Sequence, residues 1–164
     1  MKKEQHEQIS RRAFDVFRGD AESIPPMTLR GGDAVDNYDE PPAHDPAIDN
    51  STDEYLDTYA FTGLAFLDAA SWRHYLPSLI DYALRNFRDA ASVSLAIDGL
   101  LYSLRPPDRD PPRLGSLSSE QEAVIVEFLD TLAFGDESTH NDLAMQVLEE
   151  YWVPGALYRK TEEQ

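Results

Sequence analysis

The stretch RGGDAVDNYDEPPAHD, from Arg30 to Asp45, is the part of the sequence whose residue types come closest to a chemical pattern. Its carboxylates are hard oxygen ligands of the kind that calcium and magnesium prefer, and they also attract basic proteins. The ordered spacing of acids, glycine and a closing glutamate that marks an EF-hand calcium loop does not occur here. Three interpretations stay open: a cation site, a docking strip for a basic protein, and a solvated connection between helices.

A docking strip would combine negative charge with an aromatic side chain. Its residues would be Asp33, Asp36, Tyr38, Asp39 and Glu40. Acids at an interface raise the association rate more than the affinity, so exposed aromatics such as Tyr38 or Tyr158 must supply the affinity. In a solvated connection, Tyr38 and Val35 would instead pin the loop to the core.

A second candidate is a set of arginines in the middle of the chain, because every basic residue from position 58 to 113 is an arginine. Guanidinium groups bind carboxylates and phosphates through two parallel hydrogen bonds, so such a set can form an anion pocket. The same residues can equally form structural ion pairs, as the spacing of Asp81 and Arg85 on one helix and the flanking of Arg109 by Asp108 and Asp110 indicate. The set comprises Arg73, Asp81, Arg85, Arg105, Arg109 and Arg113.

Catalytic and metal-binding patterns are absent from the sequence. His6, His44, His74 and His140 are too scattered for two imidazoles to share a helix face, as a zinc site requires. Asp68, Ser71 and His74 lie at steps of three along one helix face, but a regular helix lacks the strained turn and the oxyanion donors that acyl transfer needs. Nucleotide-binding glycine motifs do not occur either. We therefore assign no catalytic residue, metal ligand or cofactor; the sequence favours a protein without enzymatic activity but leaves that question open.

The charge distribution limits the partners. The net charge is −17, and it is concentrated in residues 20–57, which sum to −10, and residues 114–158, which sum to −9. Such a field repels nucleic acids and anionic membranes and favours basic proteins. Simple solubility or adaptation to salt would also explain it, since aspartate outnumbers lysine by 18 to 3. Without cysteine, an apolar leader or a long apolar run, the sequence predicts a cytoplasmic protein, and it leaves homo-oligomerisation open.

Helical spacing of apolar residues accounts for the rest of the chain, and no segment alternates with the period of a strand. The pattern predicts an all-α fold of five to seven helices in a single domain over residues 1–164. We expect a helix at 4–18, an irregular acidic Pro/Gly-rich segment at 20–50, central helices within 51–104, a Pro/Arg connector at 105–117, two C-terminal helices within 118–153 and a tail at 154–164.

Capping residues and aromatics refine these elements. Ser51 with Glu54 and Ser118 with Gln121 match the capping box, and Thr139 is the predicted cap of the last helix. Pro77 predicts either one bent helix or two abutting ones around it. Val93 opens an apolar stripe that runs to Leu104. Six aromatics fall at core spacing and would either fill the core or line an apolar groove: Trp72, Tyr75, Tyr82, Phe128, Tyr151 and Trp152.

Four stretches together resemble a family of small bacterial proteins described as a domain of unknown function: RGGDAVDNYD, SWRHYLPSLIDYALR, LRPPDRDPPRL followed by SLSSEQEAVIVEFLDTLAF, and VLEEYWVPGALYR. The likeness covers most of the chain. It implies a compact helical protein and no established activity, substrate or cofactor, so it carries over no catalytic residue.

The sequence thus favours a non-enzymatic acidic helical protein that binds a basic protein partner, as an immunity-type or regulatory factor. The alternative is a divalent-metal-assisted hydrolase or a small-ligand binder, which would use the acids between 33 and 45 or the interior Asp/Arg set.

Overall fold

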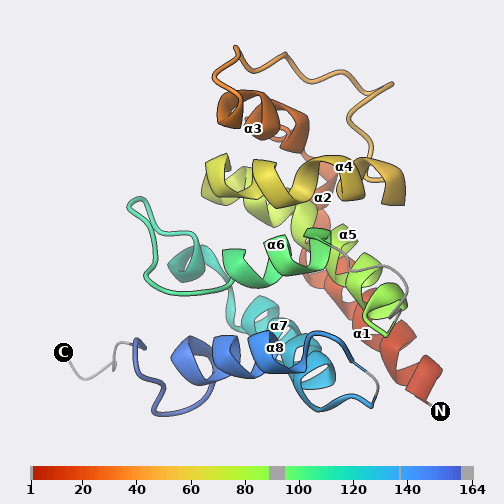
Figure 1. Cartoon of the computed structure of the whole chain (residues 1–164), viewed down its shortest axis with the longest axis vertical. Coiled ribbons are helices and arrows are strands. Elements are labelled where there is room, and N and C mark those ends of the chain that lie inside the picture. The colour runs from red at the N-terminus through yellow and green to blue at the C-terminus, as the bar shows by residue number, and fades with distance from the viewer. Residues whose placement is uncertain (1, 89–94, 137, 160–164) are drawn as a thin grey trace.

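The computed structural model describes the whole chain except residues 1, 89–94, 137 and 160–164. It is all helical over the described residues, as the sequence predicts (Figure 1). The α-helices are α1 (Lys2–Val16), α2 (Arg18–Glu22), α3 (Leu29–Asp36), α4 (Asp53–Gly63), α5 (Ala69–Asn86), α6 (Leu95–Ser103), α7 (Ser119–Phe134) and α8 (Asn141–Val147). Short 3-10 turns at Leu64–Phe66 and Leu114–Ser116 and a π-helical turn at Leu148–Trp152 complete the elements.

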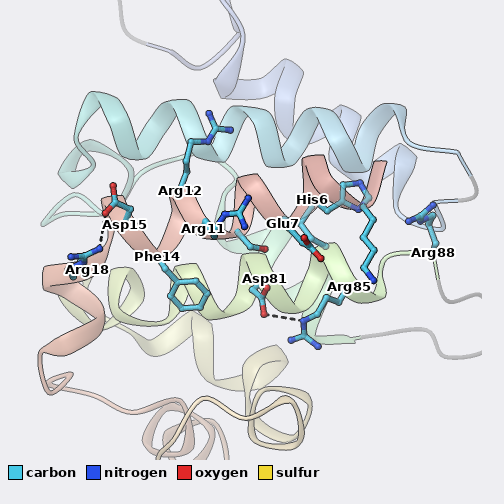
Figure 2. Close-up of a pocket in the computed structure, with 13 residues that line it drawn as sticks. His6, Glu7, Arg11, Arg12, Phe14, Asp15, Arg18, Asp81, Arg85 and Arg88 are labelled. Carbon is cyan, nitrogen blue, oxygen red and sulfur yellow. Dashed lines mark hydrogen bonds and ion pairs between the residues drawn. The ribbon is translucent and has the colours of Figure 1, made fainter. Parts of the chain in front are cut away.

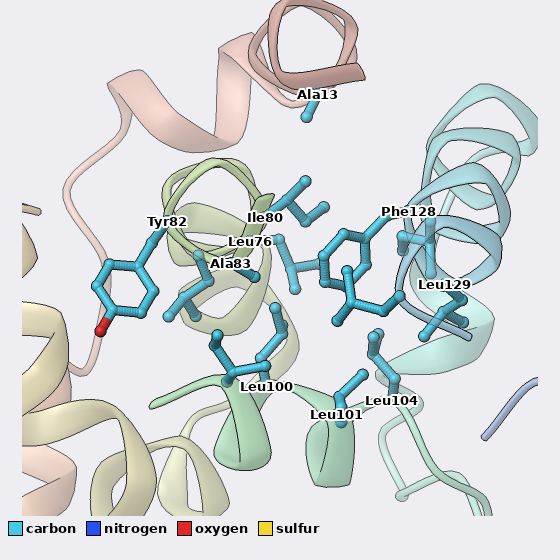
Figure 3. Packing of buried hydrophobic residues seen from close by; sticks show 14 of the residues in the cluster. Ala13, Leu76, Ile80, Tyr82, Ala83, Leu100, Leu101, Leu104, Phe128 and Leu129 are labelled. Carbon is cyan, nitrogen blue, oxygen red and sulfur yellow. The ribbon is translucent and has the colours of Figure 1, made fainter. Parts of the chain in front are cut away.

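Helix α5 lies at the centre of the arrangement and contacts α1, α2, α6 and α7. Helices α3 and α4 pack on each other at one end of the molecule, while α7 and α8 pack on each other at the opposite end (Figure 1). Figure 3 shows how the core forms between them: side chains of α5 face those of α6 and α7, namely Leu76, Ile80, Leu100, Leu101 and Phe128. Removing large apolar side chains of this kind from water stabilises a fold by roughly 1.5–3 kcal/mol each.

Five of the six predicted core aromatics are buried. Trp72, Tyr75 and Phe128 have no exposed surface, and Tyr82 and Trp152 are 5% exposed. Tyr151 is half-buried and packs against this cluster. The interpretation of these residues as core is confirmed for the five buried ones.

The predicted irregular segment at 20–50 is wrong in part, because α3 and most of α2 lie inside it and raise the number of α-helices among the described residues to eight. Thr28 caps α3, since its side chain accepts a hydrogen bond from the backbone N–H of Gly31 at 2.8 Å. Glycine has a low intrinsic helix propensity, which argued against a helix at Gly31 and Gly32, but tertiary contact outweighs that preference here.

The contact between α3 and α4 explains the glycines. A Cβ atom added at Gly32 would lie 2.4 Å from the carbonyl oxygen of Gly63, and one added at Gly63 would lie 2.4 Å from the carbonyl oxygen of Leu29. The two helices therefore approach each other through their backbones at this crossing. A side chain at either position would separate them.

Several helix ends also differ from the sequence prediction. Thr52 rather than Ser51 caps α4, with its side chain accepting from the N–H of Tyr55. Thr139 does not cap α8, whose N-cap residue is His140. Neighbouring polar residues compete for a cap, and the backbone entry to each helix decides between them.

Other predicted boundaries are confirmed. Ser118 and Gln121 form both hydrogen bonds of a capping box at the start of α7. Pro77 lies inside one continuous helix, α5, so the two-helix alternative is wrong. The apolar stripe predicted from Val93 is α6 from Leu95 onward, and Val93 itself lies outside the described residues. Residues 160–164 of the predicted tail lie outside them as well.

None of the described helices is both long enough and apolar enough to cross a membrane.

Candidate functional site

The strongest candidate for an interaction surface is the acidic strip, which we define as residues 36–40 at the end of α3. The backbone N–H groups of Asn37 and Asp39 turn back onto the carbonyl of Ala34 at 3.0 and 2.8 Å and end the helix. Tyr38 sits in the left-handed region with φ 63°, which is uncommon for a residue other than glycine. Its side chain is 99% exposed. Tyr38 therefore does not pin the loop to the core, contrary to one of the sequence interpretations.

The five residues that the sequence predicted for a docking strip, Asp33 and four residues of the acidic strip, do not have equivalent surroundings. Asp36, Asp39 and Glu40 are exposed, and no ion pair joins them to the rest of the described chain. Asp33 is half-buried and accepts a hydrogen bond from the hydroxyl of Thr62 on α4. Asp33 thus contributes to the contact between α3 and α4, whereas the other two aspartates and the glutamate project their charge into solvent beside Tyr38.

A buried ion pair attaches the loop that follows the strip. The side chain of Asp49 is fully buried and accepts hydrogen bonds from Arg30 Nε at 3.0 Å, Arg30 Nη2 at 2.8 Å and the Tyr55 hydroxyl at 2.7 Å. The backbone N–H of Asp45 donates to the same carboxylate at 2.8 Å. Burial alone would raise the pKa of Asp49, but the hydrogen bonds from Arg30 and Tyr55 outweigh it and lower the pKa to about 2.

We call this Arg30–Asp49 ion pair the anchor. The sequence did not reveal it, because Arg30 and Asp49 are nineteen positions apart and the prolines between them hide any helical spacing. The anchor links the start of α3, the loop and α4. It places the acidic strip on a loop that is held at both sides, at the α3 end of the molecule (Figure 1).

Four members of the predicted set, three arginines and Asp81, form ion pairs. Arg73 contacts Asp20 at 3.1 Å, and Arg85 contacts both Asp53 and Asp81 at 2.8 and 3.0 Å. Arg105 makes two parallel hydrogen bonds to Glu150, each 2.8 Å long. Asp81 and Arg85 are the pair that the helical spacing indicated. Of the two interpretations that the sequence allowed, structural ion pairs rather than an anion pocket describe these residues.

Arg109 and Arg113 behave differently, since no ion pair among the described residues involves either of them. Arg109 donates to the carbonyl of Ala65 at 2.6 Å, and Arg113 donates to that of Leu64 at 3.1 Å. The expected pairing of Arg109 with its neighbour Asp108 does not form through the guanidinium group. Instead the Asp108 carboxylate accepts backbone N–H groups, including those of Arg109 and Arg113 at 2.8 Å.

His74 and His140 have structural partners. Nδ1 of His74 lies 3.0 Å from the carbonyl oxygen of Asp20, while the hydroxyl of Ser71 accepts the N–H of Met27 at 2.8 Å. Ser71 and His74 thus have separate partners. His140 lies 3.1 Å from a carboxylate oxygen of Asp98. Across the part of the chain that the structure describes, no three His, Asp or Glu side chains gather as metal ligands.

A groove of about 950 Å³ between α1 and α5 is a site that sequence reasoning missed (Figure 2). Six basic and three acidic residues line it: Lys3, Arg11, Arg12, Arg18, Arg85 and Arg88, with Glu7, Asp15 and Asp81. Figure 2 shows Phe14 directed from α1 toward α5, with the Asp81–Arg85 pair across from it. The net positive charge of the first nineteen residues was the signal of this groove in the sequence. Only the packing of α1 on α5, however, brings Arg85 and Arg88 to the same groove.

Comparisons with known proteins identify a family but no individual curated protein or solved structure. No curated protein and no solved structure matches the chain. The model of the family of unknown function DUF6714 matches residues 5–156, which is nearly the full length of the sequence. The resemblance noted in the sequence is thereby confirmed at the level of a family without assigned activity, and the chain belongs to the DUF6714 family.

Proposed function

We propose that the protein is a non-catalytic binding protein whose acidic strip docks a basic protein partner, in an immunity-type or regulatory role. The observation that carries the proposal is Tyr38, a large aromatic side chain that is 99% exposed and held in a left-handed backbone conformation. A side chain displayed in this way at an energetic cost to the backbone is typical of a functional position. Tyrosine is also among the residues that most often dominate the energy of an interface.

The exposed charges around Tyr38 would steer a basic partner toward the acidic strip. Asp36, Asp39 and Glu40 are exposed, and together with the net charge of −17 they would accelerate encounter with a cationic surface. The basic groove between α1 and α5 lies away from the strip, since the strip follows α3 at the other end of the molecule from the start of α1 (Figure 1). We therefore expect a basic partner to bind at the α3 end rather than in the groove.

The anchor at Asp49 supports the same proposal through preorganisation. The loop is tied to α3 and α4 by the bonds from Arg30 and Tyr55, so the strip needs little ordering when it binds. A preorganised segment loses less conformational entropy on binding, and more of its contact energy appears as affinity.

The test is capture of the partner from a lysate of the source organism with three versions of the protein. The first is wild type, and the second carries Asp36→Asn, Asp39→Asn and Glu40→Gln. The third is a control that loses the same three charges from exposed positions on α7, α8 and the π-helical turn: Asp130→Asn, Asp142→Asn and Glu149→Gln. We expect a basic protein in stoichiometric amount on wild type and on the control, and its loss from the strip variant.

A high-salt wash and a Tyr38 variant make the test more specific. Raising the salt from about 0.1 M to about 1 M shortens the screening length from about 10 Å to about 3 Å, and should release a partner held by charge. Tyr38→Ala should weaken binding by about 2 kcal/mol, which is about thirtyfold in the dissociation constant. Equal capture by all versions, or a captured protein that is acidic, would contradict the proposal.

The alternative expected from the sequence was a divalent-metal-assisted hydrolase or a small-ligand binder. No specific observation favours the hydrolase, and a rise in melting temperature with magnesium, calcium, manganese or zinc is the measurement that would revive it. The small-ligand form has one observation in its favour, the buried guanidinium of Arg113.

A further inference from the structure

A pocket of about 380 Å³, which we call the connector pocket, lies beside the segment that joins α6 to α7. Three arginines line it, Arg105, Arg109 and Arg113, together with Tyr102 and Ser103 from the end of α6. Fourteen residues in the whole chain are basic, so this pocket concentrates positive charge in a strongly acidic protein. Its size lies in the range of sites for small organic ligands.

Arg113 is the central feature of the pocket because its charge is buried without a carboxylate partner. The residue is 3% exposed, and its guanidinium lies 4.9 Å from the ring centre of Trp72. One of its terminal nitrogens donates to the carbonyls of Leu64 and Leu67, at 3.1 and 3.4 Å. The other, Nη2, is buried and has no hydrogen-bond partner among the described residues. A buried cation in this state is costly unless a counter-charge arrives.

Arg109 adds a second guanidinium group without an ion-pair partner among the described residues. Its guanidinium donates to the carbonyls of Ala65 and Leu67, so Arg109 and Arg113 share the Leu67 oxygen. Two like charges this close repel each other. Burial, together with the charge of Arg109, lowers the pKa of Arg113 to about 9, which still leaves the guanidinium charged at neutral pH.

The acids near the pocket do not neutralise these two arginines directly. The Asp108 carboxylate accepts four backbone N–H groups at 2.8 Å, which folds the connector around it and uses its oxygens. Asp68 and Asp110 line a separate pocket of about 490 Å³, which Arg109 and Arg113 also line. Arg105 already binds Glu150. The residues that line the connector pocket thus include one aspartate and three arginines.

We propose that the connector pocket binds a dianionic oxyanion, the phosphate group of a small phosphomonoester, with Arg109 and Arg113 as the principal ligands. The flat guanidinium fork donates two parallel hydrogen bonds, and the three terminal oxygens of a phosphate can serve two such forks at once. Tyr102, 52% exposed beside Pro106 and Pro107, offers a ring surface for the organic part of the ligand. Because the net charge of the protein repels anions, affinity here comes from short-range hydrogen bonds.

Trp72 provides a reporter for the test, because it contacts Arg113 and the chain has only one other tryptophan. In a Trp152→Phe background, tryptophan fluorescence is followed while inorganic phosphate replaces chloride at constant ionic strength. We expect a saturable change with phosphate and none with chloride. Glycerol phosphate, tested in the same way, should bind at least as tightly as inorganic phosphate. Succinate, a dianion without a phosphate group, should bind more weakly.

Two variants decide whether the arginines bind the anion. Arg109→Gln removes an exposed side chain and should weaken phosphate binding by about tenfold or more, since a charged hydrogen bond contributes that much. Arg18→Gln is an equal loss of charge at an exposed position outside the connector pocket, in the groove between α1 and α5, and should leave phosphate binding unchanged if the connector pocket is the site. Arg113→Lys keeps the charge but loses the fork, and should behave like Arg109→Gln.

The melting temperature gives a readout that does not depend on fluorescence. Phosphate should raise the melting temperature of wild type and of Arg18→Gln, and at the same concentration should raise that of Arg109→Gln clearly less. The proposal is overturned if phosphate produces no saturable change beyond chloride, or if Arg109→Gln and Arg18→Gln respond alike. A failure of Arg113→Lys to fold leaves the comparison of Arg109→Gln with Arg18→Gln as the deciding result.

Discussion

Replacing Gly32 with alanine should destabilise the protein, although alanine is the better helix former. The new Cβ would lie 2.4 Å from the Gly63 carbonyl oxygen and 2.9 Å from Gly63 Cα, whereas ordinary contact begins at 3.4 Å. Because the opposing atoms are backbone, α3 and α4 would have to separate by about 1.0 Å, the difference between 2.4 and 3.4 Å. Forcing extra atoms into a packed contact costs about 1–3 kcal/mol, and the upper value applies where no side chain can rotate away.

The helix propensity of alanine returns about 1 kcal/mol, so the expected net loss is about 2 kcal/mol. For a chain of this length, that lowers the melting temperature by about 4–8 °C. Gly19→Ala is the matched control, since Gly19 lies in α2 with nothing within 4 Å of the added Cβ. The control should keep its melting temperature or raise it by about 2–4 °C. A Gly32→Ala protein as stable as wild type in thermal melts would refute the backbone contact.

Further predictions concern the anchor and the caps. Asp49→Asn should cost about 3 kcal/mol in urea unfolding, because it leaves Arg30 without its buried partner. The folded-state pKa of Asp49, about 2, lies below its ordinary 3.8, so wild-type stability should fall as the pH drops from about 4 to about 2; a variant with the same acid dependence would disprove the anchor. Thr52→Ala should cost about 1 kcal/mol and Ser51→Ala almost nothing, and the reverse order would show that Ser51 is the cap.

The sequence predicted the elements whose signals are local. The stripe that became α6 and the capping box at Ser118 depend on spacings within one helix, and both lie where expected. Helix α3 was missed because two glycines and flanking prolines favour irregular structure locally. Its stability depends on the approach of Gly32 to Gly63, a contact between segments that only the folded chain brings together.

The candidate sites show the same contrast between local signals, which the sequence reveals, and contacts between distant segments, which it does not. The sequence identified Tyr38 and the acids beside it, because composition marks such a stretch wherever it lies. It could not tell which arginines have carboxylate partners: Arg105 finds Glu150 forty-five positions away, while Arg109, flanked by two acids in sequence, binds carbonyls instead. Partners of this kind depend on tertiary packing, so only the three-dimensional structure separates the ion pairs from the two unpaired guanidinium groups.

The most direct test of the docking strip places a photoreactive benzoyl-phenylalanine at position 38 and illuminates the protein in a lysate of its source organism. The matched control carries the same residue at Phe134, which is 66% exposed at the end of α7. We expect a crosslink from position 38 to one basic protein, reduced when Asp36, Asp39 and Glu40 are neutralised, and no such product from position 134. Equal crosslinking from both positions, or none from position 38, would contradict it.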